Sequence, residues 1–252
     1  MMTQFTIGYS ALGLSIPVVK LITESLIAAA EEHPADIELL VRDNALDDDR
    51  ALENVQFFVE SDVDLAIIYH INERIGPEFY RMLVPRPIIA VDIPIPLARY
   101  FGANNALAGE LIGEALANWV VENWDSQVDR VLVLTDSRVV SVVRERVDSA
   151  VRSLREVISV EDQNIMYLDG GTTFDVSYER TKEVLERWTN AQRIVVFGVN
   201  DDMVLGAYQA AADMGRENNV ILGGQGADEQ FRQHITLPNP RVVASTDFQF
   251  SQ

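Results

Sequence analysis

A short polar turn, Asn200-Asp201-Asp202, holds the residues best suited to contact a ligand. The apolar run 194–197 before it is rich in β-branched residues and predicts a strand buried on both faces. Residues 203–214 after it have a helical composition. In an open α/β sheet such a turn lies at the carboxyl end of its strand, where ligands bind. The alternative is that these polar side chains only cap the helix.

The composition excludes several function classes. A net charge of −19 argues against binding nucleic acid, because an acidic surface repels phosphates. The chain has no cysteine, which excludes disulfides, thiolate nucleophiles and cysteine-bound metals. Its histidines show no metal-ligand spacing, and no nucleophile–base pair or Walker-type loop is recognisable. We therefore expect no metal, no cofactor and no enzymatic activity, and an α/β enzyme is the weakest alternative.

The 252 residues can fold as one large α/β domain or two smaller ones. No apolar run has the length of a membrane span, and the first residues lack the features of a signal peptide. Either the protein is cytoplasmic or a leader has been removed. The sequence from 223 to 226, Gly-Gly-Gln-Gly, lacks the spacing of a dinucleotide-binding loop and is interpreted as a turn.

Hydrophobic patterns predict strands and helices in alternation, which is typical of parallel sheets with right-handed crossovers. The pattern restarts after residues 92–104, so we expect two lobes. The predicted strands are 5–9, 37–41, 65–69, 87–91, a short extended segment 99–104, 131–134, 164–168, 194–197, 220–222 and 241–246. The predicted helices are 16–32, 47–61, 73–83, 106–123, 140–157, 176–189, 203–214 and 227–233.

Several segments, in order, resemble the ribose/galactose-type periplasmic sugar-binding proteins, whose fold is shared by the effector domains of lactose-repressor-type regulators. They are IGYSALGLSIPVV (7–19), Arg42-Asp43-Asn44, PIIAVDIPIP (87–96), FGANNALAGELIGEAL (101–116), VVRERVDSAV (142–151), Asn200-Asp201-Asp202-Met203 with Gly206-Ala207, and RVVASTDF (241–248).

The resemblance implies two doubly wound parallel-sheet lobes that are joined by a three-crossing hinge and enclose a ligand cleft. Residues 1–103 plus 242–252 would form the N-terminal lobe and residues 104–241 the C-terminal lobe. Because the last strand-like run is not followed by the covering helices of the family, the C-terminus is expected to be truncated.

The resemblance also implies ligand-binding residues. Asp92 would accept hydrogen bonds from sugar hydroxyls, Arg146 would donate them, and Asn200 would do both. Phe174 would stack on the sugar ring. The remaining candidates are Gln225, where the family often has Asp, and the rim or wall residues Ser10, Asp43 and His70.

Three of these candidates have structural alternatives. Arg146 could simply pair with Glu145 or Asp148 on its own helix. Phe174 could be a hydrophobic staple packed in the core. His70 is better interpreted as a strand-end histidine whose hydrogen bonds are satisfied within the protein.

The function implied is a solute-binding protein that captures a sugar or polyol for an ABC permease outside the cytoplasm. The alternative is a cytoplasmic effector domain of a lactose-repressor-type regulator, or a sensor, with the same cleft. Four apolar residues replace polar or aromatic family residues in the first lobe, which favours a less polar sugar derivative or another small polar molecule. They are Ile16, Val18, Val19 and Ile93.

Overall fold

The computed structural model describes residues 4–139 and 142–248 and divides into two compact units. The first unit ends at Ala103 and the second runs from Asn104 to Phe248. Among the described residues the chain passes between the units once, after Ala103. The other two crossings of the expected three-crossing hinge lie outside the described residues.

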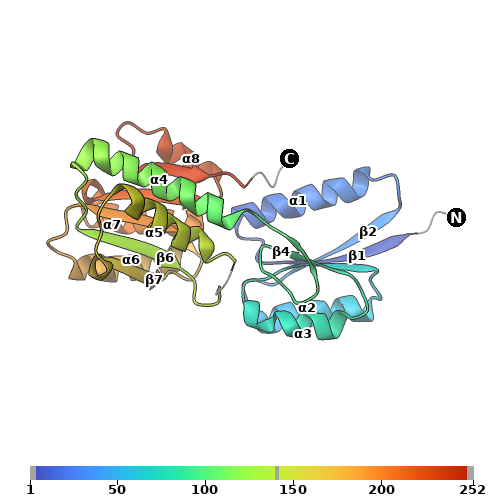
Figure 1. Ribbon diagram of the computed structural model, residues 1–252. Helices are drawn as coiled ribbons and strands as arrows, with labels where there is room; N and C mark the ends of the chain where they lie inside the picture. The colour runs from blue at the N-terminus through green and yellow to red at the C-terminus, as the bar shows by residue number, and fades with distance from the viewer. Residues whose placement is uncertain (1–3, 140–141, 249–252) are drawn as a thin grey trace. The chain divides into compact units, whose positions relative to one another are not determined.

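The first unit is a five-stranded sheet in the order β2-β1-β3-β4-β5, in which every neighbouring pair is parallel. Figure 1 shows α1 on one face of this sheet and α2 with α3 on the other. The elements are β1 (Phe5–Ala11), α1 (Pro17–Glu32), β2 (Ile37–Asp43), α2 (Asp48–Glu60), β3 (Leu65–Tyr69), the 3-10 turn η1 (Glu73–Ile75), α3 (Gly76–Leu83), β4 (Ile88–Val91) and β5 (Arg99–Phe101).

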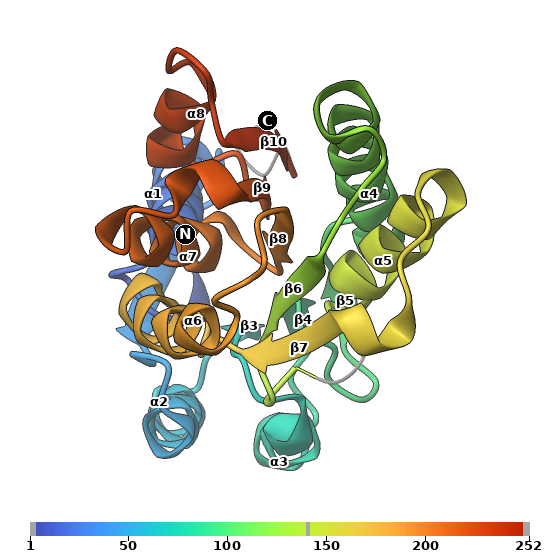
Figure 2. The ribbon, with the colours of Figure 1, turned by 90° about the vertical axis from the view of Figure 1, so that its left-hand side faces the viewer.

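The second unit repeats this architecture with the strand order β10-β9-β8-β6-β7, again all parallel. In Figure 2, α4 and α5 lie on one face of the sheet and α6 and α7 on the other. The elements are α4 (Asn105–Trp124), β6 (Arg130–Thr135), α5 (Glu145–Val157), η2 (Asp162–Asn164), β7 (Ile165–Asp169), α6 (Phe174–Arg187), β8 (Ile194–Gly198), α7 (Asp201–Asp213), η3 (Glu217–Asn219), β9 (Val220–Gln225), α8 (Glu229–Ile235) and β10 (Val242–Thr246).

Three details differ from the sequence prediction. Strand β10 (Val242–Thr246) pairs with β9 in the second sheet, so its residues belong to the second unit and not to the first lobe. The glycine-rich segment 223–225 is the buried end of β9 rather than a turn. Helix α5 begins at Glu145, and the start predicted for it at residue 140 lies outside the described residues.

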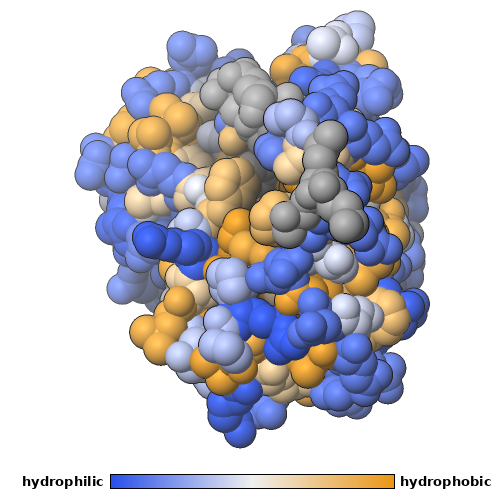
Figure 3. All heavy atoms as spheres, turned by 90° about the vertical axis from the view of Figure 1, so that its right-hand side faces the viewer, coloured by the Kyte–Doolittle hydropathy of each residue, from blue (hydrophilic) through white to orange (hydrophobic). Residues whose placement is uncertain are grey.

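Apolar side chains from helices and strands fill the core of each unit. In the first unit Phe58 of α2 and Phe79 of α3 are fully buried against the sheet. Gly8 of β1 permits this packing, because a Cβ there would lie 2.6 Å from the Phe58 ring. Figure 3 shows that apolar residues also interrupt the hydrophilic surface on the side seen there. Among the described residues the most exposed large apolar side chain is that of Leu97, at 85%.

Helix N-termini follow directly from strand ends, which concentrates polar residues at one edge of each sheet. The side chains of Asp47, Asn104 and Asn200 accept hydrogen bonds from backbone N–H groups in the first turns of α2, α4 and α7. In each unit the carboxyl ends of parallel strands therefore carry the capping and the candidate ligand residues together.

Candidate functional sites at the strand ends

The carboxyl ends of β1 to β4, here called the first edge, hold a buried network around Asn44. The amide Oδ1 of Asn44 accepts hydrogen bonds from the Ser10 hydroxyl at 2.6 Å and from Asn54 Nδ2 at 2.8 Å. Its Nδ2 donates to the carbonyl of Tyr69 at 3.0 Å. Ser10 and Asn44 are at most 1% exposed. This network fixes the ends of three neighbouring strands in one register.

Asp43 organises the loops beside this network. Its Oδ1 accepts from the backbone N–H groups of Leu14 at 3.1 Å and Ala45 at 3.0 Å. The side chain thereby ties the loop after β1 to the loop after β2. These contacts give Asp43 a structural role at the rim.

His70 follows β3 and is 2% exposed. Its ring packs edge-on against Phe79 with the centroids 4.8 Å apart. The ring interacts with the backbone of Asn72, but neither ring nitrogen forms a well-aligned hydrogen bond among the described residues, so the satisfied strand-end histidine stays a prediction. Burial lowers the pKa of His70 to about 4, because the charged imidazolium is poorly solvated there. The ring is therefore neutral at pH 7.

Asp92 follows β4 and adopts a left-handed backbone conformation with φ of 60°. It is 6% exposed, its N–H donates to the carbonyl of Phe101 at 2.8 Å, and its carbonyl accepts from the Tyr100 hydroxyl at 3.3 Å. Aspartate tolerates this conformation better than most residues, but it carries strain, and such strain is often found at functional sites.

The second edge is the corresponding set of strand ends in the second unit, and Arg146 is its centre. The guanidinium is 5% exposed and donates from Nε to Asn105 Oδ1 at 2.5 Å and from Nη1 to the Val199 carbonyl at 3.1 Å. It also lies over the Phe248 ring, 4.4 Å from its centroid. These partners replace the pairing with Glu145 or Asp148 that the sequence left open.

Gln225, at the end of β9, joins this cluster. It is 1% exposed, and its Nε2 donates to the backbone carbonyl of Arg146 at 3.2 Å. Its Oε1 has no partner among the described residues.

Asn200 both caps a helix and links two loops. Its Oδ1 accepts from Met203 N at 2.9 Å, as the capping alternative predicted, and its Nδ2 donates to the Thr172 carbonyl at 3.0 Å. The Thr172 hydroxyl in turn donates to Asp136 at 2.6 Å. Burial would raise the pKa of Asp136, but hydrogen bonds from Arg138 and Thr172 outweigh it and hold that pKa below the usual value.

Asp201 is fully buried beside this chain of contacts. Its carboxylate accepts from the Ser245 hydroxyl at 2.7 Å and from the backbone N–H of Asp228 at 2.8 Å, joining β10 to the loop after β9. Burial raises the pKa of Asp201 to about 7 despite these hydrogen bonds. A Cβ on Gly224 would lie 2.0 Å from this carboxylate, which explains why glycine occupies that strand position.

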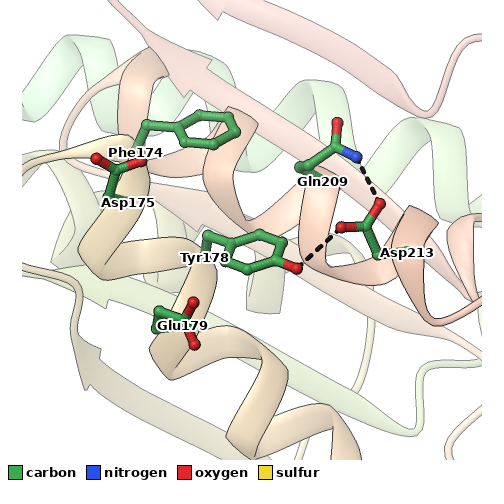
Figure 4. Close-up of a pocket in the computed structure, with 6 residues that line it drawn as sticks. All are labelled: Phe174, Asp175, Tyr178, Glu179, Gln209 and Asp213. Atoms are coloured by element: carbon green, nitrogen blue, oxygen red, sulfur yellow. Dashed lines mark hydrogen bonds between the residues drawn. The ribbon is translucent and has the colours of Figure 1, made fainter.

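Phe174 opens α6, and its ring lies in a groove between α6 and α7. The ring stacks on Tyr178 with centroids 6.5 Å apart and planes 6° from parallel. Figure 4 shows both rings in this groove of about 340 Å³. Its other lining residues are Asp175, Glu179, Gln209 and Asp213. The Phe174 ring thus packs in this groove, apart from the cluster of Arg146 and Gln225.

Each edge therefore gathers the candidates of its own unit: Ser10, Asp43, His70 and Asp92 in the first, and Arg146, Asn200 and Gln225 in the second. The network residues Asn44, Asn105, Asp136 and Thr172 were not among the candidates predicted from the sequence. Asn44 and Asp136 could have been found by their position directly after a strand. The sequence gives no such indication for Asn105 and Thr172, because the packing of α4 on α5 and the loop before α6 bring them to the edge.

Comparisons with known proteins agree with this architecture. A search of curated proteins gave no match. The family model described as periplasmic binding protein domain matches residues 7–245. The chain belongs to this family. The resemblance inferred from the segment order is thereby confirmed, as is the fold class of two parallel-sheet α/β units.

Solved structures of periplasmic binding proteins superpose on nearly the whole chain. An ABC transporter solute-binding protein from Mycobacterium smegmatis with bound glycerol has a TM-score of 0.79 and 18% identity, covering 94% of this chain and 80% of that one. One from Burkholderia multivorans, with an unknown ligand represented as α-D-erythrofuranose, has a TM-score of 0.82 and 12% identity, covering 99% and 88%. One from Bacillus halodurans with bound myo-inositol has a TM-score of 0.75 and 17% identity, covering 93% and 80%.

The family and these structural neighbours are binding proteins rather than enzymes. Within 4–139 and 142–248, no cluster of three or more His, Cys, Asp or Glu residues could hold a metal ion. In the same ranges, none of the helices combines the length and apolar character needed to cross a bilayer.

Proposed function

We propose that this periplasmic binding protein captures a sugar or related polyol and delivers it to an ABC permease outside the cytoplasm. The ligand would be bound by polar groups at the strand ends of both units, with Asp92, Arg146 and Asn200 as the main hydrogen-bonding residues. Ser10, Asp43, His70, Phe174 and Gln225 complete the set of candidate ligand-binding residues.

The observation that carries this proposal is the cluster of Arg146, Asn200 and Gln225 at one sheet edge. Guanidinium and amide groups are planar, and they bind neighbouring hydroxyls with fixed direction. The structural neighbours named above are transport proteins with glycerol, an unknown ligand represented as a furanose, and myo-inositol. They favour transport over the regulator alternative.

The test is a thermal-shift and calorimetric screen against glycerol, myo-inositol, L-arabinose and D-allose. A bound ligand stabilises the folded state by about 2.7 kcal/mol at one hundred times its dissociation constant, which gives a clear rise in melting temperature. We expect such a rise for at least one of these neutral probes. Asp92→Ala and Asn200→Ala should each abolish it.

Asn200→Ala also removes a helix cap, which costs about 1 kcal/mol of stability by itself. Asn104→Ala is the matched control, because Asn104 caps α4 in the same unit and its side chain accepts from Leu107 N at 3.2 Å. The control should lower the melting temperature and still show the ligand-induced rise. If both site variants retain that rise, the assignment of the site is wrong.

A further inference from the structure

Resting on the proposed sugar-binding function, we propose that Asn105 is a ligand-binding residue and acts with Gln225 as a donor–acceptor pair for neighbouring ligand hydroxyls. Both residues contact Arg146 and both are at least 97% buried. They come from α4 and β9, which contact each other and lie side by side in Figure 2.

The orientation of the Asn105 amide is set by its partner. A guanidinium only donates hydrogen bonds, so the atom of Asn105 that faces Arg146 must be the acceptor Oδ1. The donor Nδ2 then points away from Arg146. It is buried and has no partner among the described residues.

The Gln225 amide is fixed by the opposite constraint. The backbone carbonyl of Arg146 only accepts, so the atom of Gln225 that faces it must be the donor Nε2. The acceptor Oε1 points elsewhere and is likewise buried without a partner in the part of the chain that the structure describes. The two contacts with Arg146 thus leave one buried donor, Asn105 Nδ2, and one buried acceptor, Gln225 Oε1, without a partner in the described part of the chain.

A buried amide with a purely structural role looks different in this protein. Asn54 accepts from Arg42 Nε at 3.2 Å through Oδ1, and its Nδ2 donates to the Asp43 carbonyl and to Asn44 Oδ1. Both ends of that amide are used. An unpaired buried polar atom lowers stability, so a ligand that forms hydrogen bonds with Asn105 Nδ2 and Gln225 Oε1 would remove that cost.

The pair also defines the ligand class. A hydroxyl donates one hydrogen bond and accepts others, so two neighbouring hydroxyls satisfy both the donor of Asn105 and the acceptor of Gln225. A carboxylate or phosphate offers acceptors only, and it would place like partial charges against Gln225 Oε1. The site should therefore prefer neutral polyols over sugar acids.

Asn105→Asp is the sharpest test, because the aspartate keeps an acceptor for Arg146 and replaces the donor by a second, negatively charged acceptor. A sugar oxygen that accepts from Nδ2 would then face an acceptor, and its hydroxyl could donate to that acceptor only by giving up another hydrogen bond. We expect affinity for whichever neutral probe the wild type binds to fall roughly tenfold or more, the effect of one lost hydrogen bond. The ligand-free melting temperature should not fall.

Asn164→Asp is the matched control. Asn164 in the same unit also accepts from an arginine, Arg130, through Oδ1, but at the opposite end of the strands. This variant should bind the probe as the wild type does. Gln225→Met removes the acceptor with a side chain of similar size, and it should also weaken binding roughly tenfold. If Asn105→Asp does not fold, Gln225→Met decides by the same criterion.

Calorimetry with the four neutral probes and with D-gluconate separates the outcomes. If the wild type binds a neutral probe and Asn105→Asp binds it equally well, the pair is wrong and the proposed function stands. Tighter binding of gluconate than of every neutral probe would likewise overturn the pair. If the wild type binds none of the five, the proposed function fails and the pair fails with it.

Discussion

The two edges hold similar residue types, but charged side chains lie at the centre of the second edge and a neutral amide lies at the centre of the first. At the second edge, Arg146, Asp136 and Asp201 each have hydrogen-bond partners supplied by the protein. At the first edge the network centres on a neutral amide, Asn44. Of the buried titratable groups there, which include Asp92, His70 is neutral at pH 7.

From this contrast we expect the two edges to contribute differently to ligand binding. The second edge places its hydrogen-bonding groups rigidly before any ligand arrives, which lowers the entropy cost of binding and gives directional specificity. The first edge is lined in part by apolar residues, and Ile16, Val19 and Ile93 are at most 7% exposed. We expect it to supply a less polar wall with few directional contacts, in line with the departures seen in the sequence.

The largest expected effect concerns Asp201. Its folded-state pKa of about 7 lies above the unfolded value, so the folded state holds its proton more tightly. The stability that Asp201 contributes is complete below about pH 4 and is lost as the pH rises through 7. The total is at most about 4 kcal/mol, at 1.4 kcal/mol per pKa unit.

Asp201→Asn removes this dependence, because an amide does not titrate. Urea unfolding followed by tryptophan fluorescence checks it, since Trp119, Trp124 and Trp188 all lie in the second unit. The free energy of unfolding of the wild type, relative to that of Asp201→Asn, should decrease from pH 4 to pH 7. A difference that stays constant over this range would show that Asp201 is ionised throughout.

His70 should respond to pH with the opposite sign. Its folded-state pKa of about 4 lies below the ordinary 6.5. The stability that the neutral ring contributes is therefore complete above about pH 6.5 and is lost as the pH falls toward 4, by at most about 3 kcal/mol. As the pH rises from 4 to 7, Asp201 thus lowers the free energy of unfolding, whereas His70 raises it.

NMR titration of the imidazole signals measures this directly, with exposed His33 as the internal reference. The His70 signals should stay those of a neutral ring down to about pH 5. His70→Asn should make the first unit less sensitive to acid than the wild type. Titration of His70 near pH 6.5 would mean that the ring is solvated, and the contrast between the edges would disappear.

The sequence predicted the order of strands and helices because each element carries its own hydrophobic period and ends in capping or glycine residues. It also placed Asn200 correctly at a helix start. It assigned 242–248 to the wrong unit because only the pairing partner of a strand, here β9, decides which sheet it joins. No local pattern carries that information.

Long-range contacts also explain the other errors. Glycines 223 and 224 looked like a turn, but they are strand residues that leave space for Leu116 and Asp201. The partners of Arg146 and the burial of His70 depend on residues that are distant in sequence. Local patterns therefore gave the positions of several candidate residues, whereas their hydrogen bonds required the folded chain.

The smallest expected effect tests how helix packing places Arg146. A Cβ on Gly109 of α4 would lie 2.3 Å from the Arg146 carbonyl oxygen in α5, and one on Gly113 would lie 2.4 Å from that of Ala150. Each Gly→Ala substitution must push the two helices apart, at a cost of about 2 kcal/mol. Both variants should lose stability to a similar extent in urea unfolding.

Only Gly109→Ala should also weaken sugar binding, because Arg146 moves with its backbone, whereas Gly113 acts one turn further from the edge. Comparing the two variants therefore separates the effect of lost stability from the effect of a displaced Arg146. Equal affinity in the two variants would mean that Arg146 keeps its position through Asn105 and Val199 even when the helices separate. The rigidity of the second edge would then come from its hydrogen bonds rather than from the packing of α4 on α5.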